Sequence, residues 1–403
     1  MTTLSVVIPA YNEENGIEAI ARRVLGIHDD LAKVGVDGLE VLVVNDGSKD
    51  RTAEIAGNIP GVRLITYPKN QGYGAALKNG FSQACGELIG FLDADGTYPP
   101  EYFPGLCQEA LRGSQLVIGS RMAGAESKMP VTRRIGNVFF ATLLSLVSRQ
   151  RVTDSASGMR VFRREILEQI YPLPNGLNLT PVMSTRAIHE GISVVEVPIP
   201  YSERLGRSKL SVIRDGSVFL QSIIWTALAY NPVRILGLVG LGGILVALIV
   251  LAGLVLARLQ GVTVLQPLEI TSLFWGAVSG VTGLSIFALG ATFNYLVSLF
   301  YKEPIHQGLF GRPLFKPSLD RHFGWMGLAS LVAGLAIGVT SAVLGMAGWE
   351  IDRLWLYLLG AAMSILMGVQ LIFYWILMRI LENLSQREIL RQADLKSNFT
   401  GSN

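Results

Sequence analysis

Four long stretches in the second part of the chain contain no Asp, Glu, Lys or Arg, and they constrain the fold more than any other feature. They lie at about residues 235–257, 270–300, 324–348 and 354–378. An α-helix rises ~1.5 Å per residue, so each stretch is long enough to cross a hydrocarbon core ~30 Å thick. The sequence therefore predicts four transmembrane helices.

Basic residues indicate how these helices are oriented. The connection between the second and third stretches and the segment after the fourth carry Lys302, Arg312, Lys316, Arg321, Arg379, Arg387, Arg391 and Lys396. The other two connections carry only Arg258 and Arg353. Cytoplasmic loops are enriched in Lys and Arg, and no basic, signal-like segment precedes the strand-like run that begins at Leu4. We therefore expect the first half and the C-terminus to be cytoplasmic.

The composition changes abruptly near Asn231 and Pro232, which divides the chain. The predicted parts are a cytosolic α/β domain at 1–210, an interfacial helix and linker at 211–232, a transmembrane domain at 233–380 and a cytosolic tail at 381–403. Two further segments, 134–146 and 211–230, place apolar residues at helical spacing beside polar ones. This pattern predicts helices that lie on the inner leaflet, with two core helices as the alternative.

Charge and cysteine content exclude two classes of protein. The net charge of +3 is small, and no dense stripe of Lys and Arg with interleaved aromatic residues occurs in the first half, which argues against a nucleic-acid partner. The only two cysteines, Cys85 and Cys107, lack metal-type spacing. We therefore expect reduced thiols rather than a zinc site or a disulfide.

The first half alternates short, β-branched-rich runs with helix-length segments. The predicted strands are 4–8, 39–44, 62–65, 87–92 and 115–118, and the predicted helices include 16–25 and 52–58. This alternation is typical of a mostly parallel sheet in an α/β fold. Ligands of such sheets bind at the carboxyl ends of the strands.

Polar clusters follow three of these strands: Pro9–Glu14, Asn45–Asp50 and Asp93–Thr97. Any one of them could be a turn that caps the next helix. Together, at successive strand ends, they predict a site for a nucleoside diphosphate. Asp93 and Asp95 suit Mg²⁺ or Mn²⁺, because hard cations take oxygen ligands and commonly share them with substrate phosphates.

The first half is similar to glycosyltransferase family 2 in four motifs, at residues 7–14, 43–50, 70–74 and 93–95. In three later motifs, at residues 119–121, 153–160 and 203–210, it resembles the polyprenyl-phosphate branch, which includes dolichyl-phosphate mannose synthase. The resemblance implies a GT-A, Rossmann-like fold for this half. The branch commonly has Asp-Ala-Asp-Leu-Gln, whereas this chain has Gly96 and Thr97 after its second aspartate.

The resemblance also implies roles for individual residues. The residues implied to bind the nucleotide sugar are Pro9, Tyr11, Glu13, Val44, Asp46, Asp93, Ala94, Asp95, Arg204 and Lys209. Those at the positions of metal ligands are Asp93, Asp95 and Thr97. A bound Mg²⁺ or Mn²⁺ would stabilise the charge that accumulates on a departing nucleoside diphosphate.

A polyprenyl phosphate has a second pKa of about 6, so at neutral pH it is already an anionic nucleophile. Bringing two anions together requires cations that bind phosphate. The predicted acceptor contacts are Arg121, Arg133 and Arg134, and the predicted catalytic residues are Asp93, Asp95, Arg121 and Arg204. An ordinary surface charge is the alternative for each arginine, and Asp154 either orients one of them or caps the turn before Gly158.

The sequence thus predicts a metal-dependent, inverting transfer of one hexose from a nucleotide sugar, such as GDP-mannose or UDP-glucose, to dolichyl or undecaprenyl phosphate. One alternative is a polysaccharide synthase, although the segment Gln221–Trp225 lacks the arginine of the Gln-x-x-Arg-Trp motif. The other is a membrane protein that senses nucleotide sugars without transferring them. Charge-free spans argue against a transport path, and the sequence leaves a homo-oligomer open.

Overall fold

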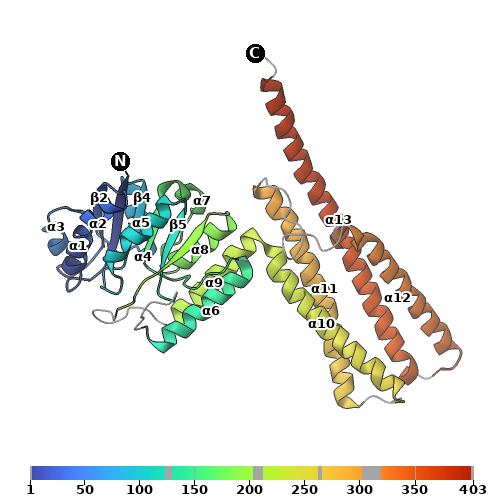
Figure 1. Cartoon of the computed structure of the whole chain (residues 1–403). Helices are drawn as coiled ribbons and strands as arrows, with labels where there is room; N and C mark the ends of the chain where they lie inside the picture. The colour runs from blue at the N-terminus through green and yellow to red at the C-terminus, as the bar shows by residue number, and fades with distance from the viewer. Residues whose placement is uncertain are drawn as a thin grey trace. The chain divides into compact units, whose positions relative to one another are not determined.

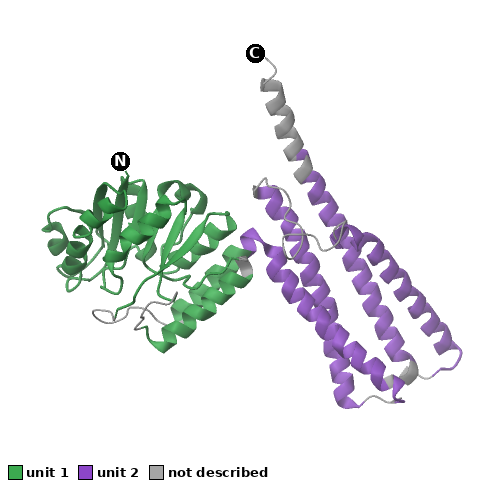
Figure 2. Cartoon of the chain, in the orientation of Figure 1, with its two compact units in different colours: residues 1–227 green, residues 228–403 purple. Residues whose placement is uncertain are grey.

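The chain forms two compact units, residues 1–227 and residues 228–403 (Figure 2). The computed structural model describes residues 2–122, 129–148, 150–202, 212–261, 266–301, 319–349 and 351–400. The first unit is an α/β domain, and the second consists of long helices (Figure 1).

A single seven-stranded sheet organises the first unit, with its strands in the order β3-β2-β1-β4-β6-β5-β7. The strands are β1 (Thr3–Ala10), β2 (Gly38–Asp46), β3 (Val62–Tyr67), β4 (Leu88–Phe91), β5 (Leu116–Ser120), β6 (Arg160–Arg163) and β7 (Val194–Pro198). Every neighbouring pair is parallel except the two that involve β6, which is antiparallel to both β4 and β5. The predicted mostly parallel sheet is confirmed.

Helices cover both faces of this sheet. They are α1 (Ile17–Leu25), α2 (His28–Lys33), α3 (Thr52–Gly57), α4 (Tyr73–Gln83), α5 (Phe103–Leu111), α7 (Leu167–Ile170) and α8 (Leu179–His189). The first unit also contains α6 (Val131–Ser148) and α9 (Val212–Tyr230). Successive strand residues point to opposite faces, so Val6 packs with α1 and α5 in one core, whereas Val7 packs with α4 and α8 in the other. The sheet is therefore buried on both sides, and its strand ends are left for ligands.

Helices α6 and α9 lie side by side in the first unit (Figure 1). They meet through Phe140 and Phe219, whose ring centroids are 5.9 Å apart. On α6, apolar side chains at helical spacing stay exposed: Val131, Ile135, Val138, Phe139 and Leu146. A helix whose outer stripe is apolar is unusual on a water-facing surface, and the interfacial position of this helix stays a prediction.

The described residues of the second unit form four long apolar helices, as predicted. They are α10 (Pro232–Leu259), α11 (Pro267–Tyr301), α12 (Phe323–Met346) and α13 (Ile351–Thr400). By length and composition the segments 232–257, 267–300, 319–346 and 354–384 can each cross a membrane. The segment 381–400, predicted as a tail, continues α13 without interruption.

Glycines bring the helices of this unit together in two hairpins. A β-carbon on Gly240 of α10 would lie 2.6 Å from the carbonyl oxygen of Gly283 in α11. One on Gly327 of α12 would lie 2.8 Å from the carbonyl oxygen of Gly368 in α13. Backbones therefore touch in both hairpins, as small residues permit in lipid. Ser285 links the hairpins by donating to Gln370 Oε1 at 2.9 Å.

Candidate active site

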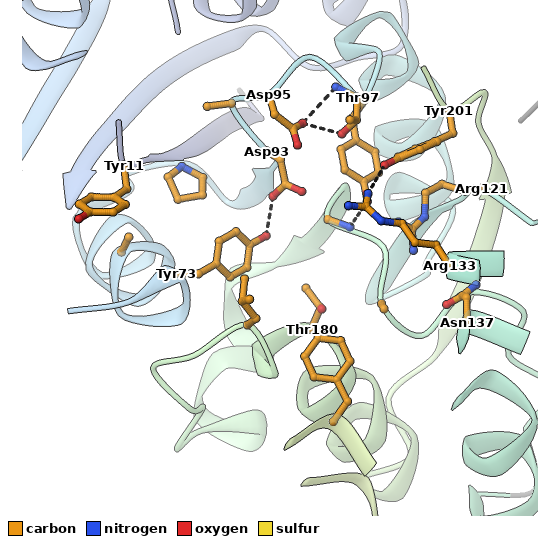
Figure 3. Close-up of a pocket in the computed structure, with 18 of the residues that line it drawn as sticks. Tyr11, Tyr73, Asp93, Asp95, Thr97, Arg121, Arg133, Asn137, Thr180 and Tyr201 are labelled. Atoms are coloured by element: carbon orange, nitrogen blue, oxygen red, sulfur yellow. Dashed lines mark hydrogen bonds between the residues drawn. The ribbon is translucent and has the colours of Figure 1, made fainter. Parts of the chain in front are cut away.

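A cavity of about 530 Å³ lies where the polar clusters predicted from the sequence converge (Figure 3). Loops after β1, β2, β4 and β5 form one part of its lining, with Glu13, Asp46, Asp93, Asp95 and Arg121. The other part comes mainly from α6 and α9, where the apolar residues Gly136, Phe140, Gly216 and Phe219 lie beside the polar Thr132, Arg133 and Asn137. The cavity thus joins a charged region at the strand ends to an apolar region between two helices.

Asp93 and Asp95 follow β4 and are each held by a hydroxyl group (Figure 3). Tyr73 donates from its hydroxyl to Asp93 Oδ1 at 2.8 Å. Thr97 donates to Asp95 Oδ1 from its hydroxyl at 2.6 Å and from its backbone N–H at 3.1 Å. Thr97 therefore orients Asp95, while it also lines the cavity.

The phenol of Tyr73 remains a hydrogen-bond donor. Burial, and after it the charge of Asp93, raises the pKa of Tyr73 well above its ordinary value near 10. The hydroxyl is consequently protonated at neutral pH. It therefore donates its hydrogen bond to Asp93, which accepts through Oδ1.

Asp46, at the end of β2, organises the segment that leads into α4. Its Oδ1 accepts the backbone N–H of Gln71, and its Oδ2 accepts that of Gly72, both at 2.8 Å. The turn after Asp46 is equally tight, because a β-carbon on Gly47, whose φ is +70°, would lie 2.6 Å from the backbone nitrogen of Asn70. Asp46 therefore lines the cavity and also holds the backbone of Gln71 and Gly72 in place.

The loops after β1 and β2 are joined by hydrogen bonds. Asn12, whose φ of 53° lies in the left-handed region, donates its backbone N–H to Ser48 Oγ and accepts from Lys49 N–H through Oδ1. Glu13 donates its backbone N–H to Thr52 Oγ1 at 2.8 Å. Of the predicted nucleoside-binding residues, Pro9 therefore lies near the end of β1, and Tyr11 and Glu13 lie on the loop that these hydrogen bonds hold in place.

Arg121 is fixed by a buried carboxylate. Its Nε and Nη2 donate to the two carboxylate oxygens of Asp154, both at 2.7 Å, and its Cζ lies 5.8 and 5.5 Å from the ring centroids of Tyr98 and Tyr201. Burial alone would raise the pKa of Asp154, but Arg121 overcomes this effect and holds that pKa below its usual range. Of the two roles left open for Asp154, the structure shows that of orienting an arginine.

The remaining predicted cations are placed differently. Arg133 lines the cavity and donates to the Tyr201 hydroxyl at 3.2 Å. Arg134 follows it on α6 and is exposed outside the cavity lining, because neighbouring helical residues point about 100° apart. Arg204 and Lys209 lie outside the described residues.

Of the residues predicted to bind the nucleotide sugar, Val44 does not line the cavity. Its side chain is fully buried in the core with α4, because β2 is covered on both faces. Sequence reasoning missed Tyr73, Tyr98, Tyr201 and Gly158, all of which line the cavity. Tyr73 lies in the motif at 70–74 and Gly158 in the motif at 153–160. Membership of these motifs was the sequence signal that could have identified the two residues.

The donor set at this site fits a divalent cation that is shared with a substrate. In the described part of the chain, no group of three or more His, Cys, Asp and Glu side chains could hold a metal on its own. Asp93 and Asp95 offer carboxylate oxygens at one wall of the cavity. Mg²⁺ is typically held in this way, by one or two carboxylates together with water and the phosphates of a substrate.

Comparisons with known proteins agree with this geometry. The family model for glycosyl transferase family 2 matches residues 5–171, and a domain of unknown function (DUF8752) matches residues 232–392. A dolichyl-phosphate hexose transferase of Haloferax volcanii is 36% identical over 221 residues, which are 55% of this chain and 92% of that protein.

Two further proteins are more distant. An undecaprenyl-phosphate 4-deoxy-4-formamido-L-arabinose transferase of Photorhabdus laumondii is 29% identical over 71% of this chain and 82% of its own length. Glucosyl-3-phosphoglycerate synthase of Mycobacterium tuberculosis, solved with Mn²⁺, UDP and phosphoglyceric acid, has a TM-score of 0.45 and 22% identity, covering 57% of this chain and 78% of that one. With its matched motifs and its relatives, the chain belongs to glycosyltransferase family 2, in the branch of polyprenyl-phosphate sugar transferases.

Proposed function

We propose that this glycosyltransferase moves one hexose from a nucleotide sugar to the phosphate of a polyprenyl phosphate, with inversion and with a divalent cation. The observation that carries the proposal is one cavity that joins paired carboxylates and two arginines to an apolar region between α6 and α9. Such a cavity suits a polar phosphorylated donor at one end and a lipid phosphate at the other. The second unit supports the proposal, because four of its described helices are long and apolar enough to cross a membrane.

The charged end of the cavity suits the donor. Pro9, Tyr11, Glu13 and Asp46 would contact the nucleoside, and Asp93 and Asp95, with Thr97 behind Asp95, would hold Mg²⁺ or Mn²⁺ against the diphosphate. The cation, when bound, supplies charge stabilisation for the leaving group. Ala94 lies between the two aspartates in the chain and also lines the cavity. Arg204 and Lys209, which lie outside the described residues, are further proposed contacts of the nucleotide sugar.

The acceptor phosphate would approach from the side of α6. Arg133 reaches the cavity directly, and Arg121 presents a guanidinium whose plane is already set by Asp154. A phosphate oxygen attacks the anomeric carbon, the bond from that carbon to the diphosphate oxygen breaks, and the nucleoside diphosphate leaves with the electron pair. No general base is needed, because the second pKa of a phosphate monoester is about 6.

Two features support a position of the active site at the membrane surface. The apolar stripe of α6 would lie in the interface, so that the reacting phosphate stays at headgroup level. The charge pattern favours a cytoplasmic first unit and C-terminus.

The test is product formation by the purified full-length protein. It receives radiolabelled GDP-mannose or UDP-glucose, Mg²⁺ and a polyprenyl phosphate, and the products are separated by thin-layer chromatography. We expect one lipid product with a single hexose, and no product after EDTA treatment. A long polymer would indicate a polysaccharide synthase, and binding of the nucleotide sugar without any transfer would indicate a sensor.

A further inference from the structure

The Asp93 carboxylate lies between the Tyr73 hydroxyl on one side and the backbone of Gly158 on the other. Tyr73 is the first residue of α4 and donates to Asp93 Oδ1 at 2.8 Å. On the other side, a β-carbon on Gly158 would lie 2.6 Å from Asp93 Oδ2 and 2.9 Å from its Cγ. The Asp93 carboxylate is therefore confined between a hydroxyl donor and a bare glycine backbone.

Gly158 is itself held in place. Its backbone N–H donates to the Tyr98 hydroxyl at 2.7 Å. Two residues later, the fully buried guanidinium of Arg160 donates to the carbonyl oxygens of Ser155 and Ser157, at 2.9 and 3.1 Å. The segment from Ser155 to Arg160, which lies against Asp93, is thus held by hydrogen bonds. Its close approach leaves no room for the carboxylate to move toward Gly158.

The start of α4 is equally fixed. Asp46 accepts the backbone N–H groups of Gln71 and Gly72, directly before Tyr73. A β-carbon on Gly74, directly after it, would lie 2.2 Å from the carbonyl oxygen of Pro174. The backbone on either side of Tyr73 is therefore pinned, and its hydroxyl reaches Asp93 from a rigid base.

We propose that Tyr73 is a positioning residue that sets the Asp93 carboxylate for a divalent cation and ties it, through Gln71 and Gly72, to Asp46 on the nucleoside side. This inference rests on the proposed function, because the cation site belongs to it. Partners that orient a metal ligand without touching the metal commonly change metal affinity ~10–100-fold when removed. Gly158 contributes to the same arrangement, because only a residue without a side chain leaves room for the Asp93 carboxylate there.

The experiment measures cation binding rather than turnover. Full-length wild-type and Tyr73→Phe proteins in detergent are titrated with Mn²⁺ in the presence of UDP or GDP, followed by the electron paramagnetic resonance signal of free Mn²⁺. We expect the dissociation constant for Mn²⁺ to rise about tenfold in Tyr73→Phe, with the midpoint of thermal unfolding unchanged. Tyr171→Phe, a partly exposed tyrosine away from the cavity, is the matched control.

Gly158→Ala provides an independent second variant. Its φ lies outside the left-handed region, so alanine meets no backbone strain there, and the added methyl group presses on the Asp93 carboxylate. It should also weaken Mn²⁺ binding. Unchanged Mn²⁺ affinity in both variants overturns the inference, as does a loss that only follows a fall in thermal stability. A wild-type protein that binds neither Mn²⁺ nor nucleotide contradicts the proposed function instead.

Discussion

At the scale of single residues, Asp95 offers the sharpest test of the cation site. It follows β4 on a loop, is 7% exposed and is oriented by Thr97. Asp95→Ala should lower kcat by about a thousandfold or more, the size expected when a main electrostatic contribution is removed. The fold should be retained, because the residue lies at a strand end rather than in either core. Steady-state rates and thermal unfolding are measured together, with the exposed Asp29→Ala as control.

Asp154 links stability to pH. Its pKa is lowered in the folded protein, so its contribution to stability is complete above the unfolded value of about 4 and is lost as the pH falls through the folded pKa. Asp154→Asn leaves Arg121 without its buried counter-charge and should cost about 3 kcal/mol at pH 7.

Thermal unfolding of both proteins between pH 7 and pH 3 checks this prediction. The difference between wild type and Asp154→Asn should shrink as the solution becomes acidic. Asp30→Asn, on an exposed carboxylate paired with Lys33, should show no comparable difference. A gap that stays constant with pH would falsify the assigned role of the Arg121 pair.

Individual residues also show what the sequence could and could not predict. Asp93 and Asp95 could be singled out from the sequence because their cluster is one of three polar clusters at successive strand ends, whereas each cluster alone could be a turn. Tyr73 was not, because a tyrosine after a glycine-rich turn acquires a role only when α4 packs and brings its hydroxyl to Asp93. Sequence alone made Arg134 the first candidate and Arg133 a reserve, whereas the direction of the side chains on α6 puts Arg133 in the cavity lining and Arg134 outside it.

At the scale of elements, the exposed apolar stripe of α6 makes a prediction about the acceptor. Ile135 is 65% exposed, and burying such a side chain in an interface is worth ~1.5–3 kcal/mol. Ile135→Glu should raise the KM for a polyprenyl phosphate embedded in a bilayer about tenfold. The KM for a short, water-soluble prenyl phosphate should stay the same.

Leu111→Glu, at an exposed site on α5, is the matched control, because it adds the same charge away from α6. Equal changes for both acceptors would mean that Ile135 contributes to the cavity and not to membrane contact.

Two strands show where periodicity stops being informative. The runs that became β1 to β5 are rich in β-branched residues and were predicted, although their bounds differ slightly. β6 is a short Arg-Val-Phe-Arg segment with a charge at each end, and β7 contains Glu196 and Pro198. Both are defined by their partners, since β6 pairs on both edges and β7 pairs with β5. The antiparallel position of β6 between β4 and β5 depends on tertiary contacts, and no local sequence pattern predicts it.

At the scale of the whole molecule, four spans predict that both ends of the second unit lie on the side of the active site. Cysteines introduced at Gln260 and Arg387, in a protein with Cys85→Ser, can be tested with a membrane-impermeant maleimide on intact cells. Gln260→Cys should react from outside, and Arg387→Cys only after permeabilisation. Both positions are exposed, so accessibility within the protein does not limit the reaction. Labelling in the opposite sense would reverse the orientation.

The glycine contacts inside each hairpin have a consequence for how this half can vary. Positions such as Leu245 and Leu248 are more than half exposed, so many apolar residues can replace them. Gly240 and Gly283, like Gly327 and Gly368, already touch carbonyl oxygens of the facing helix, and even one methyl group would push the helices apart. In a saturation mutagenesis library of the second unit, most positions should therefore tolerate apolar substitutions. Variants at these four glycines should be depleted among the functional proteins, whichever sugar the enzyme uses.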